Sequence, residues 1–338
     1  MDYGEKSMKI VAELSANHNQ DLKLALESIK VAKEIGADAV KIQTYTPSCL
    51  TLNSDKKEFL IDGGLWNGEN LYSLYCKAYT PFEWHKELFA YAREIGITLF
   101  STPFSQEGLE LLESLSCPMY KVASFELTYL ELIKSIASTH KPIILSSGMA
   151  TDDEITEAVE ICRSVGNNDI TLLKCTSSYP TPLSEANLLA MSTFKQKWNV
   201  KIGLSDHTEG FLAPVIATSL GASMIEKHFI LDKSLGGVDS AFSLDKDEFR
   251  EMIRYVREAS SALGDKNYQN KIDDDKRRFS RSIFVSKDMK KGDVFTRENL
   301  VIKRPNCGLH PRYYEEILGK KALRDLPFAT PLQEKDFS

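Results

Sequence analysis

The stretch that decides the fold runs from residue 200 to residue 230, where VKIGLSDH (200–207) and MIEKHFI (224–230) stand on either side of a helical pattern. Both runs are almost continuously apolar and rich in β-branched residues, and each ends on polar side chains. Such runs are typical of strands in a parallel sheet, which is buried on both faces. A helix between two of them is the crossover that a parallel pair needs. We therefore predict a β-α-β unit.

The same unit recurs toward the N-terminus. Six further runs of this kind, each followed by helical periodicity, cover residues 8–14, 39–45, 98–103, 119–124, 142–147 and 170–177. Eight units within about 260 residues match the number and size of a closed (β/α)8 TIM barrel. The alternative is an open doubly wound sheet. It is disfavoured because no GxGxxG follows the first strand, and because polar residues end every strand rather than those near one switch point.

The remaining segments define the domain organisation. Residues 47–79 are rich in Gly, Asn and aromatic residues, and we expect an ordered loop that folds over the barrel mouth. Residues 265–281 are charged and lack apolar periodicity, which is typical of a linker. Residues 282–338 contain short β-like runs and Lys-Gly turns. We therefore predict a barrel over 1–264, a linker over 265–281 and a small β-rich module over 282–338.

Composition limits the partners. The 338 residues are 42% hydrophobic and 27% charged, as in soluble globular proteins. The net charge is −6 and no basic block occurs, so we expect no nucleic-acid partner. No apolar run approaches the roughly 20 residues of a membrane span, and the first residues do not resemble a signal peptide, so we expect no membrane partner. Six scattered cysteines are typical of reduced thiols and predict a cytoplasmic location.

Polar residues at the strand ends are the candidate site. A buried charge is costly unless it is paired, so lysines within apolar strands need an explanation. Lys41 and Lys121, with several hydroxyl groups around one mouth, would form a pocket suited to a doubly anionic phosphate. Any one of these residues alone is more often an ordinary scaffold residue. Their joint placement favours the anion pocket.

Two histidines, His207 and His228, end strands seven and eight of the predicted barrel. Neighbouring parallel strands lie about 4.8 Å apart, so both imidazoles can converge on one divalent cation. Two unconnected polar histidines are the alternative. With two protein ligands the cation would keep open positions for water and substrate oxygens. No GxSxG, HExxH or Walker motif competes with this interpretation.

The motifs resemble a known family. AELSANHN, AVKIQTYTP, STPFS, YKVASFE, LSSGMAT, LKCTSSYPTP, IGLSDHT and IEKHF occur in the order found in the sialic acid synthase family. SIFVSKDMKKGD, VIKRPNCGLHP and LGKKAL resemble the antifreeze-like (SAF) domain that these synthases carry. The resemblance covers nearly the whole chain. GGLWNGENLYSLY and DSAFSLDKDEF are most similar to the branch of the family that makes pseudaminic acid.

The resemblance implies a metal-dependent condensation of phosphoenolpyruvate with an open-chain N-acetylated amino sugar, giving a nine-carbon keto acid and phosphate by C–O cleavage. The metal would be Mn²⁺, Mg²⁺ or Co²⁺. For this branch the sugar is 2,4-diacetamido-2,4,6-trideoxy-L-altrose, and the product serves flagellin glycosylation. An N-acetylneuraminate or legionaminic acid synthase is the alternative, although Ser177 replaces an Asn of the N-acetylneuraminate branch and GGVDSAFS around Asp239 also departs from it. A non-catalytic antifreeze-like binding protein is a distant alternative.

The resemblance also implies residue roles. His207 and His228 would bind the metal, and the acid or base would be Glu126 or Glu13. The phosphoenolpyruvate contacts would be Lys41, Thr102, Lys121, Ser124, Ser146, Ser177 and Ser205, and the sugar contacts Glu13, Gln43, Tyr179, Asp239 and Arg304. Arg304 would reach from the antifreeze-like domain of one protomer into the barrel of the other, which implies a domain-swapped homodimer. Phe242 and Trp66 are candidates to contact the deoxygenated sugar carbon.

Overall fold

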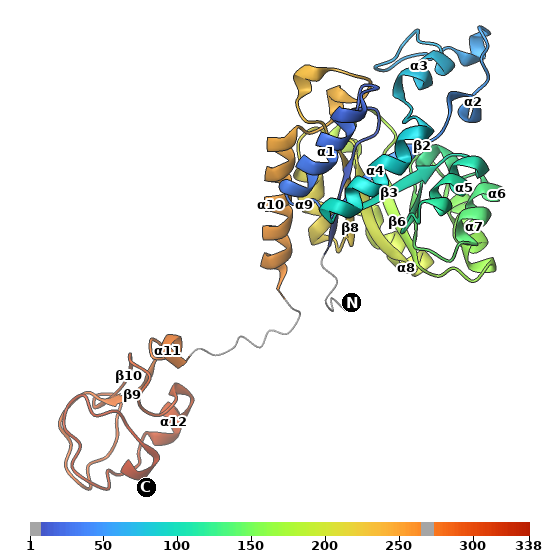
Figure 1. The fold of residues 1–338 in the computed structure, drawn as a ribbon. Coiled ribbons are helices and arrows are strands. Elements are labelled where there is room, and N and C mark those ends of the chain that lie inside the picture. Colours follow the sequence, from blue (N-terminus) through green and yellow to red (C-terminus); the bar gives the residue numbers. More distant parts are fainter. Residues whose placement is uncertain (1–7, 265–273) are drawn as a thin grey trace. The chain divides into compact units, whose positions relative to one another are not determined.

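The structure is a computed structural model that describes residues 8–264 and 274–338, in two compact units that divide at residue 264 (Figure 1). The first unit is a closed barrel of eight parallel strands in sequential order. The strands are β1 (Lys9–Glu13), β2 (Ala39–Thr44), β3 (Thr98–Pro103), β4 (Tyr120–Val122), β5 (Ile143–Ser146), β6 (Ile170–Cys175), β7 (Lys201–Asp206) and β8 (Met224–His228). The predicted (β/α)8 barrel is confirmed. The open sheet is excluded because β8 pairs with β1 and places His228 opposite Glu13.

Helices cover the outside of the barrel (Figure 1). They are α1 (Leu22–Glu34), α4 (Phe82–Ile95), α5 (Gln106–Ser114), α6 (Leu130–Ala137), α7 (Asp152–Ser164), α8 (Ala190–Trp198), α9 (Leu212–Ser219) and α10 (Lys246–Leu263). Local sequence explains their ends. The Asp245 side chain accepts hydrogen bonds from the first backbone N–H groups of α10, and α4 stops at Gly96, whose φ of 73° favours glycine.

The insertion after β2 is ordered, as predicted. It contains α2 (Pro47–Leu50), a short 3-10 turn (Lys57–Phe59) and α3 (Leu71–Ala78). Nε1 of Trp66 in this insertion donates a hydrogen bond to the carbonyl of Val238, 3.2 Å away in the loop that follows β8. The insertion therefore contacts a loop at the C-terminal end of the barrel, which is where the candidate site lies.

The second unit has its own small core. Its sheet consists of the antiparallel strands β9 (Ser282–Val285) and β10 (Leu300–Lys303), and its helices are α11 (Asp274–Arg277) and α12 (Tyr314–Ile317). Most other residues form turns and isolated bridges, as expected for a small irregular β module. Residues 265–273 of the predicted linker lie outside the described residues. No described helix is long and apolar enough to cross a membrane.

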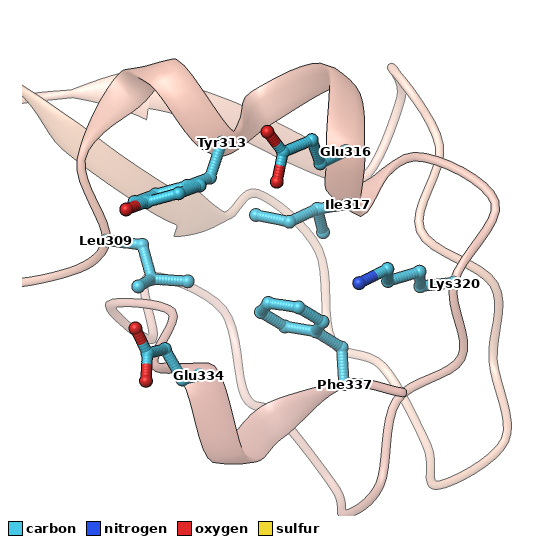
Figure 2. Close-up of a pocket in the computed structure, with 7 residues that line it drawn as sticks. All are labelled: Leu309, Tyr313, Glu316, Ile317, Lys320, Glu334 and Phe337. Atoms are coloured by element: carbon cyan, nitrogen blue, oxygen red, sulfur yellow. The ribbon is translucent and has the colours of Figure 1, made fainter.

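A shallow pocket lies on this second unit (Figure 2). Phe337, Ile317 and Leu309 form its apolar floor, and the Lys320 amine lies 4.8 Å from the centre of the Phe337 ring. None of its lining residues is among the predicted site residues. The predicted chemistry therefore has to be sought at the barrel mouth.

Candidate active site at the barrel mouth

Two lysines and two glutamates form a buried ion network inside the barrel. Lys41 Nζ lies 2.6 Å from Glu13 Oε2 and 3.5 Å from Glu226 Oε1, and Lys121 Nζ lies 3.8 Å from Glu226 Oε1. β4 and β8 are not neighbours in the sheet, so Lys121 and Glu226 can meet only by pointing into the barrel. The structure thus brings both predicted lysines together, each beside a carboxylate.

Burial and the neighbouring charges shift the pKa of all four residues in this network. Burial raises the pKa of Glu13 to about 7, although Lys41 opposes the shift. For Glu226 burial also favours the neutral form, but Lys121 and Lys41 more than offset this and lower its pKa. Burial lowers the pKa of Lys121, whereas for Lys41 the two carboxylates outweigh burial and raise it. Glu13 is therefore the member whose charge changes near neutral pH.

Hydroxyl groups surround the network. Lys41 Nζ donates to Thr102 Oγ1 at 3.3 Å, and Ser205 Oγ donates to Glu226 Oε1 at 3.4 Å. Among the residues that the structure describes, Ser146 Oγ and Ser177 Oγ are buried without a hydrogen-bond partner. Because a buried hydroxyl without a partner is costly, these two groups are suited to a ligand that brings acceptor oxygens.

The loop after β5 closes against two of the serines. At Gly148 a Cβ atom would lie 2.2 Å from Ser124 Cβ and 2.8 Å from Ser177 Oγ, and φ is 41°. Only glycine fits this close approach. Ser124 Oγ in turn lies 3.3 Å from Cys175 Sγ. The predicted serines after β4 and β6, Ser124 and Ser177, therefore both pack against Gly148.

The two histidines converge as predicted. Their ring centres lie 5.3 Å apart, both side chains are buried, and Nδ1 of His207 contacts the carbonyl of Thr176 at 3.0 Å. Nδ1 of His228 has no hydrogen bond within residues 8–264 and 274–338, although Asp239 Oδ2 lies 3.7 Å away. Burial and the nearby charge of His207 lower the pKa of His228 well below its usual value. A neutral imidazole is the form that binds a metal ion.

The donor set fits an open cation site. No group of three or more His, Cys, Asp or Glu side chains in the described part of the chain is arranged to hold a metal ion. His228 supplies a neutral imidazole with an unbonded buried nitrogen, whereas for His207 burial opposes the shift but Cys175 raises the pKa, so His207 has to release a proton before it can bind a cation. A cation held by these two residues would take its other ligands from water and substrate.

An aromatic wall adjoins the histidines. The Tyr179 ring lies 4.5 Å from His207 and 5.1 Å from Phe242, and Phe242 lies 4.8 Å from His228, all between ring centres. Trp66 from the insertion completes the wall, 5.9 Å from Tyr179. The predicted sugar residue Tyr179 is thus beside the histidine pair.

Of the remaining predicted polar residues, Gln43 and Asp239 lie in the barrel unit and Arg304 lies in the second unit. Gln43 Nε2 donates to Ser15 Oγ at 2.9 Å and lies 3.5 Å from Glu13 Oε1, at the edge of the ion network. Asp239 accepts a hydrogen bond from the backbone N–H of Ala16 at 3.3 Å. Arg304 belongs to the second unit, where its side chain is exposed.

Glu126 differs from the other carboxylates. It ends the 3-10 turn Ser124–Glu126, just beyond β4, rather than lying in a strand. One of its oxygens, Oε2, is buried and makes no hydrogen bond to any described residue. Burial raises its pKa to about 7, although Lys121 opposes the shift. A carboxyl that titrates near neutral pH can take up and release protons during a reaction.

Sequence reasoning did not assign roles to two residues of the mouth. Glu226, which holds both lysines, was recognisable because it is two positions before His228 and so shares its side of the strand. Cys175 Sγ lies 3.9 Å from His207 Nδ1, and although burial opposes the shift, that imidazole lowers the thiol pKa to about 7. No local motif marks this contact, because it joins two different strands.

A (β/α)8 barrel with buried lysines and histidines at its C-terminal mouth is typical of the barrel enzymes, whose active sites lie at that end. The NeuB family model matches residues 28–268 and the SAF domain model matches residues 280–338. The chain therefore belongs to the NeuB family, the sialic acid synthase family that the motifs indicated.

Individual relatives agree with this assignment. The chain is 57% identical to pseudaminic acid synthase from Helicobacter pylori, over 97% of both chains. It is 38% identical to N,N'-diacetyllegionaminic acid synthase from Campylobacter jejuni, over 95% of this chain and 97% of that one. The crystal structure of N-acetylneuraminic acid synthetase from Leptospira borgpetersenii is 29% identical, with a TM-score of 0.72 over 82% of this chain and 94% of that one.

Proposed function

We propose that this protein is a pseudaminic acid synthase, which condenses phosphoenolpyruvate with 2,4-diacetamido-2,4,6-trideoxy-L-altrose and water to give pseudaminic acid and phosphate. The observation that carries the proposal is the pair of buried lysines beside the converging histidines at one barrel mouth. The near full-length similarity to a pseudaminic acid synthase selects this sugar over those of the sister synthases.

The ion network and the serines form the phosphoenolpyruvate site in this proposal. The phosphate is placed at Lys41 and Lys121, where it would replace part of their contact with the glutamates. Ser146 and Ser177 supply hydroxyl groups that have no partner among the described residues, and Thr102 and Ser205 complete the shell. Charge-assisted hydrogen bonds of this kind are among the strongest that a protein makes.

His207 and His228 would hold the divalent cation on which synthases of this family depend. Mn²⁺, Mg²⁺ and Co²⁺ all suit imidazole with oxygen ligands. When bound, such a cation acts as a Lewis acid toward a carbonyl oxygen. The aromatic wall beside the histidines excludes water from this side of the mouth and orients the sugar.

The chemistry then follows from the groups in place. C3 of phosphoenolpyruvate attacks the aldehyde carbon, which forms the new C–C bond and leaves a positive charge at C2. The π electrons of the aldehyde C=O bond pass to its oxygen, which takes up a proton and becomes a hydroxyl group. Water adds to C2, and its proton passes to Glu126 or Glu13, whose pKa values are both about 7. The C2–O bond to phosphate breaks as the C2 hydroxyl loses its proton and becomes the keto group, and Lys41 and Lys121 stabilise the departing phosphate, which carries away the bonding electrons.

Sugar recognition is assigned to the residues around the histidines. Gln43, Tyr179 and Asp239 would bind the polar groups of the sugar. Trp66 lies 6.5 Å from Phe242, at the outer end of the aromatic wall, and together they offer an apolar surface for the deoxygenated carbon. Turnover of a 6-hydroxy analogue as fast as the 6-deoxy sugar would contradict this role.

We further propose a domain-swapped homodimer, with a barrel over 1–264, a linker over 265–281 and an antifreeze-like domain over 282–338. Arg304 of one protomer would complete the mouth of its partner. Loops at the mouth expose large apolar side chains, including Phe125, Met149 and Leu189, and a second copy would cover them. All six cysteines are free, which supports a reducing compartment such as the cytoplasm.

Phosphate release with each candidate sugar tests the proposed reaction. We expect release with phosphoenolpyruvate and the altrose derivative, and at most slow release with N-acetylmannosamine or the legionaminic acid precursor. Faster turnover of either of these sugars would overturn the substrate assignment. Phosphoenolpyruvate labelled with ¹⁸O in its bridging oxygen tests the cleavage, because C–O cleavage sends the label to phosphate rather than to the keto acid.

Mixing two inactive variants tests the dimer. In a swapped dimer, the barrel of an Arg304→Ala protomer receives an intact Arg304 from a His228→Ala protomer. After co-refolding at equal amounts we expect about a quarter of the wild-type activity, because half of the dimers are mixed and each has one complete site. Absence of recovery in mixed dimers would contradict the swap.

A further inference from the structure

An ion pair joins the two histidine-bearing strands, one residue before each histidine. Lys227 on β8 lies opposite Asp206 on β7, and Lys227 Nζ is 2.5 Å from Asp206 Oδ2. Both side chains are buried, Lys227 completely. Successive residues of a strand point to opposite faces, so the pair lies on the outer face of the barrel wall while His207 and His228 point to the mouth.

One further residue completes this network. Lys227 Nζ also donates to the carbonyl of Thr208 at 2.6 Å. The backbone N–H and the hydroxyl of Thr208 donate to the two oxygens of Asp206 at 3.1 and 3.2 Å. Thr208 follows His207 directly, so the network holds the backbone on both sides of that histidine.

The main chain at each histidine is anchored as well. The carbonyl of His207 accepts a hydrogen bond from Thr181 N at 2.9 Å, and that of His228 accepts one from Leu244 N at 3.0 Å. Neither histidine can shift without breaking these bonds. A satisfied buried polar network rigidifies the structure around it.

Stability alone does not explain a buried ion pair at this place. Removing two charges from water is costly, and well-packed apolar residues of similar size stabilise a fold at least as well. Burial accordingly lowers the pKa of Lys227, even though Asp206 opposes the shift. The pair instead fixes the distance between β7 and β8 next to His207 and His228.

We propose that Asp206, Lys227 and Thr208 form a positioning network that sets the separation of the His207 and His228 imidazoles for a shared divalent cation. The inference rests on the proposed function, because the separation matters only if both rings bind one ion. Residues that orient metal ligands from behind typically contribute 10–100-fold to metal affinity.

The test measures Mn²⁺ binding to the full-length protein by electron paramagnetic resonance, without substrates. In the double variant Asp206→Leu/Lys227→Met both charges are removed, so no unpaired buried charge remains. We expect Mn²⁺ to bind about 10–100-fold more weakly. The control is Arg257→Met, which breaks the 2.5 Å pair with Asp38 at the opposite end of the barrel. We expect this control to bind Mn²⁺ as the wild type does.

Mn²⁺ binding to His228→Ala is measured in parallel. This variant distinguishes failure of the proposed metal site from failure of the positioning network. If its Mn²⁺ affinity equals that of the wild type, the ion binds elsewhere, and both the proposed metal site and the inference are wrong. If His228→Ala loses binding while the folded double variant keeps wild-type affinity, the positioning network alone is overturned. If the double variant does not fold, Asp206→Asn takes its place in the Mn²⁺-binding measurement. It keeps the size of the side chain, and we expect several-fold weaker Mn²⁺ binding, so unchanged affinity would equally overturn the inference.

Discussion

Two halves of the barrel mouth hold their polar side chains differently. On β1, β2 and β8, the charges of Glu13, Lys41 and Glu226 lie within 3.5 Å of an opposite charge. Across the mouth, at the end of β5 and just beyond β4 and β6, buried oxygens of Ser146, Glu126 and Ser177 have no hydrogen-bond partner in the described chain. The charges of the first half are paired within the chain, although Glu226 Oε2 has no hydrogen-bond partner among the described residues, whereas the second half offers several unpartnered oxygens that are suited to a ligand.

This difference separates stability from binding. A buried polar group without a partner costs about 1–3 kcal/mol, and a fold tolerates this where a ligand restores the hydrogen bond. We therefore expect substitutions in the paired half to lower the stability of the free protein. Substitutions in the unpaired half should lower ligand binding and turnover while leaving stability almost unchanged.

The largest expected effect is at His228, at the end of β8, whose Nδ1 is unpartnered among the described residues. His228→Ala removes one of two cation ligands, and we expect turnover to fall by about 1,000-fold or more even in excess Mn²⁺, because Lewis-acid assistance contributes several kcal/mol. Stability should change little, since Nδ1 of His228 has no hydrogen bond to a described residue. Phosphate release and thermal melting measure both effects. His140→Asn, at an exposed position, is the control; activity retained by His228→Ala in a chelator would refute the assignment.

In the paired half, Lys41→Met leaves Glu13 buried without its main cation and Glu226 with Lys121 alone. We expect the free energy of unfolding in urea to fall by about 3–5 kcal/mol. Lys141→Met is the matched control, because it breaks an equally short pair with Glu113 that is partly exposed. That control should cost less than about 1 kcal/mol. Equal losses in the two variants would show that the mouth charges do not stabilise the fold.

Glu126→Gln tests whether the unpaired carboxyl moves a proton. We expect turnover to fall by about 100-fold or more, as is typical when a general base is lost. In the wild type a carboxyl with a pKa of about 7 is neutral below that pH, so activity should rise as pH increases through about 7. The variant should lack this rise, and the exposed control Glu131→Gln should keep it. If the rise persists in Glu126→Gln, Glu13 is the better candidate for the base.

The smallest expected effect is that of Ser146→Ala. The lost hydroxyl has no partner among the described residues, so the free protein should keep its stability or gain slightly. The KM for phosphoenolpyruvate should rise about tenfold, because one hydrogen bond to a charged ligand is lost. Thr102→Val is the comparison variant. It removes a hydroxyl that accepts a hydrogen bond from Lys41, so we expect it to lower the stability of the free protein as well as raise the KM. If Ser146→Ala lowers the stability of the free protein, the claim that the unpaired half serves binding rather than stability is wrong.

Most of the paired half could be predicted from strand patterns. Lys41 and Lys121 were recognisable because charge is rare inside apolar strands, and alternation placed His228 on the same side as Glu226. The contacts between them depend on closure of the barrel, which puts β8 beside β1. Two hundred residues separate these strands in the chain, and no local pattern encodes which carboxylate meets which lysine.

In the unpaired half, the residues beyond the strand ends could be identified from the family resemblance but not placed by strand alternation. β4 ends at Val122, two residues earlier than the predicted run, so Ser124 and Glu126 lie in a 3-10 turn whose direction alternation does not describe. The contact between Cys175 and His207 likewise joins two strands through side chains alone. Only the tertiary structure shows such proximity.

Through Glu13, the ion network can also take up and release a proton near neutral pH. Glu13, with a pKa of about 7, is partly protonated at neutral pH. At the phosphoenolpyruvate site that we propose, an arriving phosphate ester would add negative charge beside Glu13 and favour uptake of a proton, whereas departing phosphate would favour its release. Exchange of anions at this site is then accompanied by exchange of protons with the buffer. Alkaline conditions would weaken capture of the anionic substrate and speed loss of the anionic product, so one carboxyl links the acidity of the surroundings to both ends of the catalytic cycle.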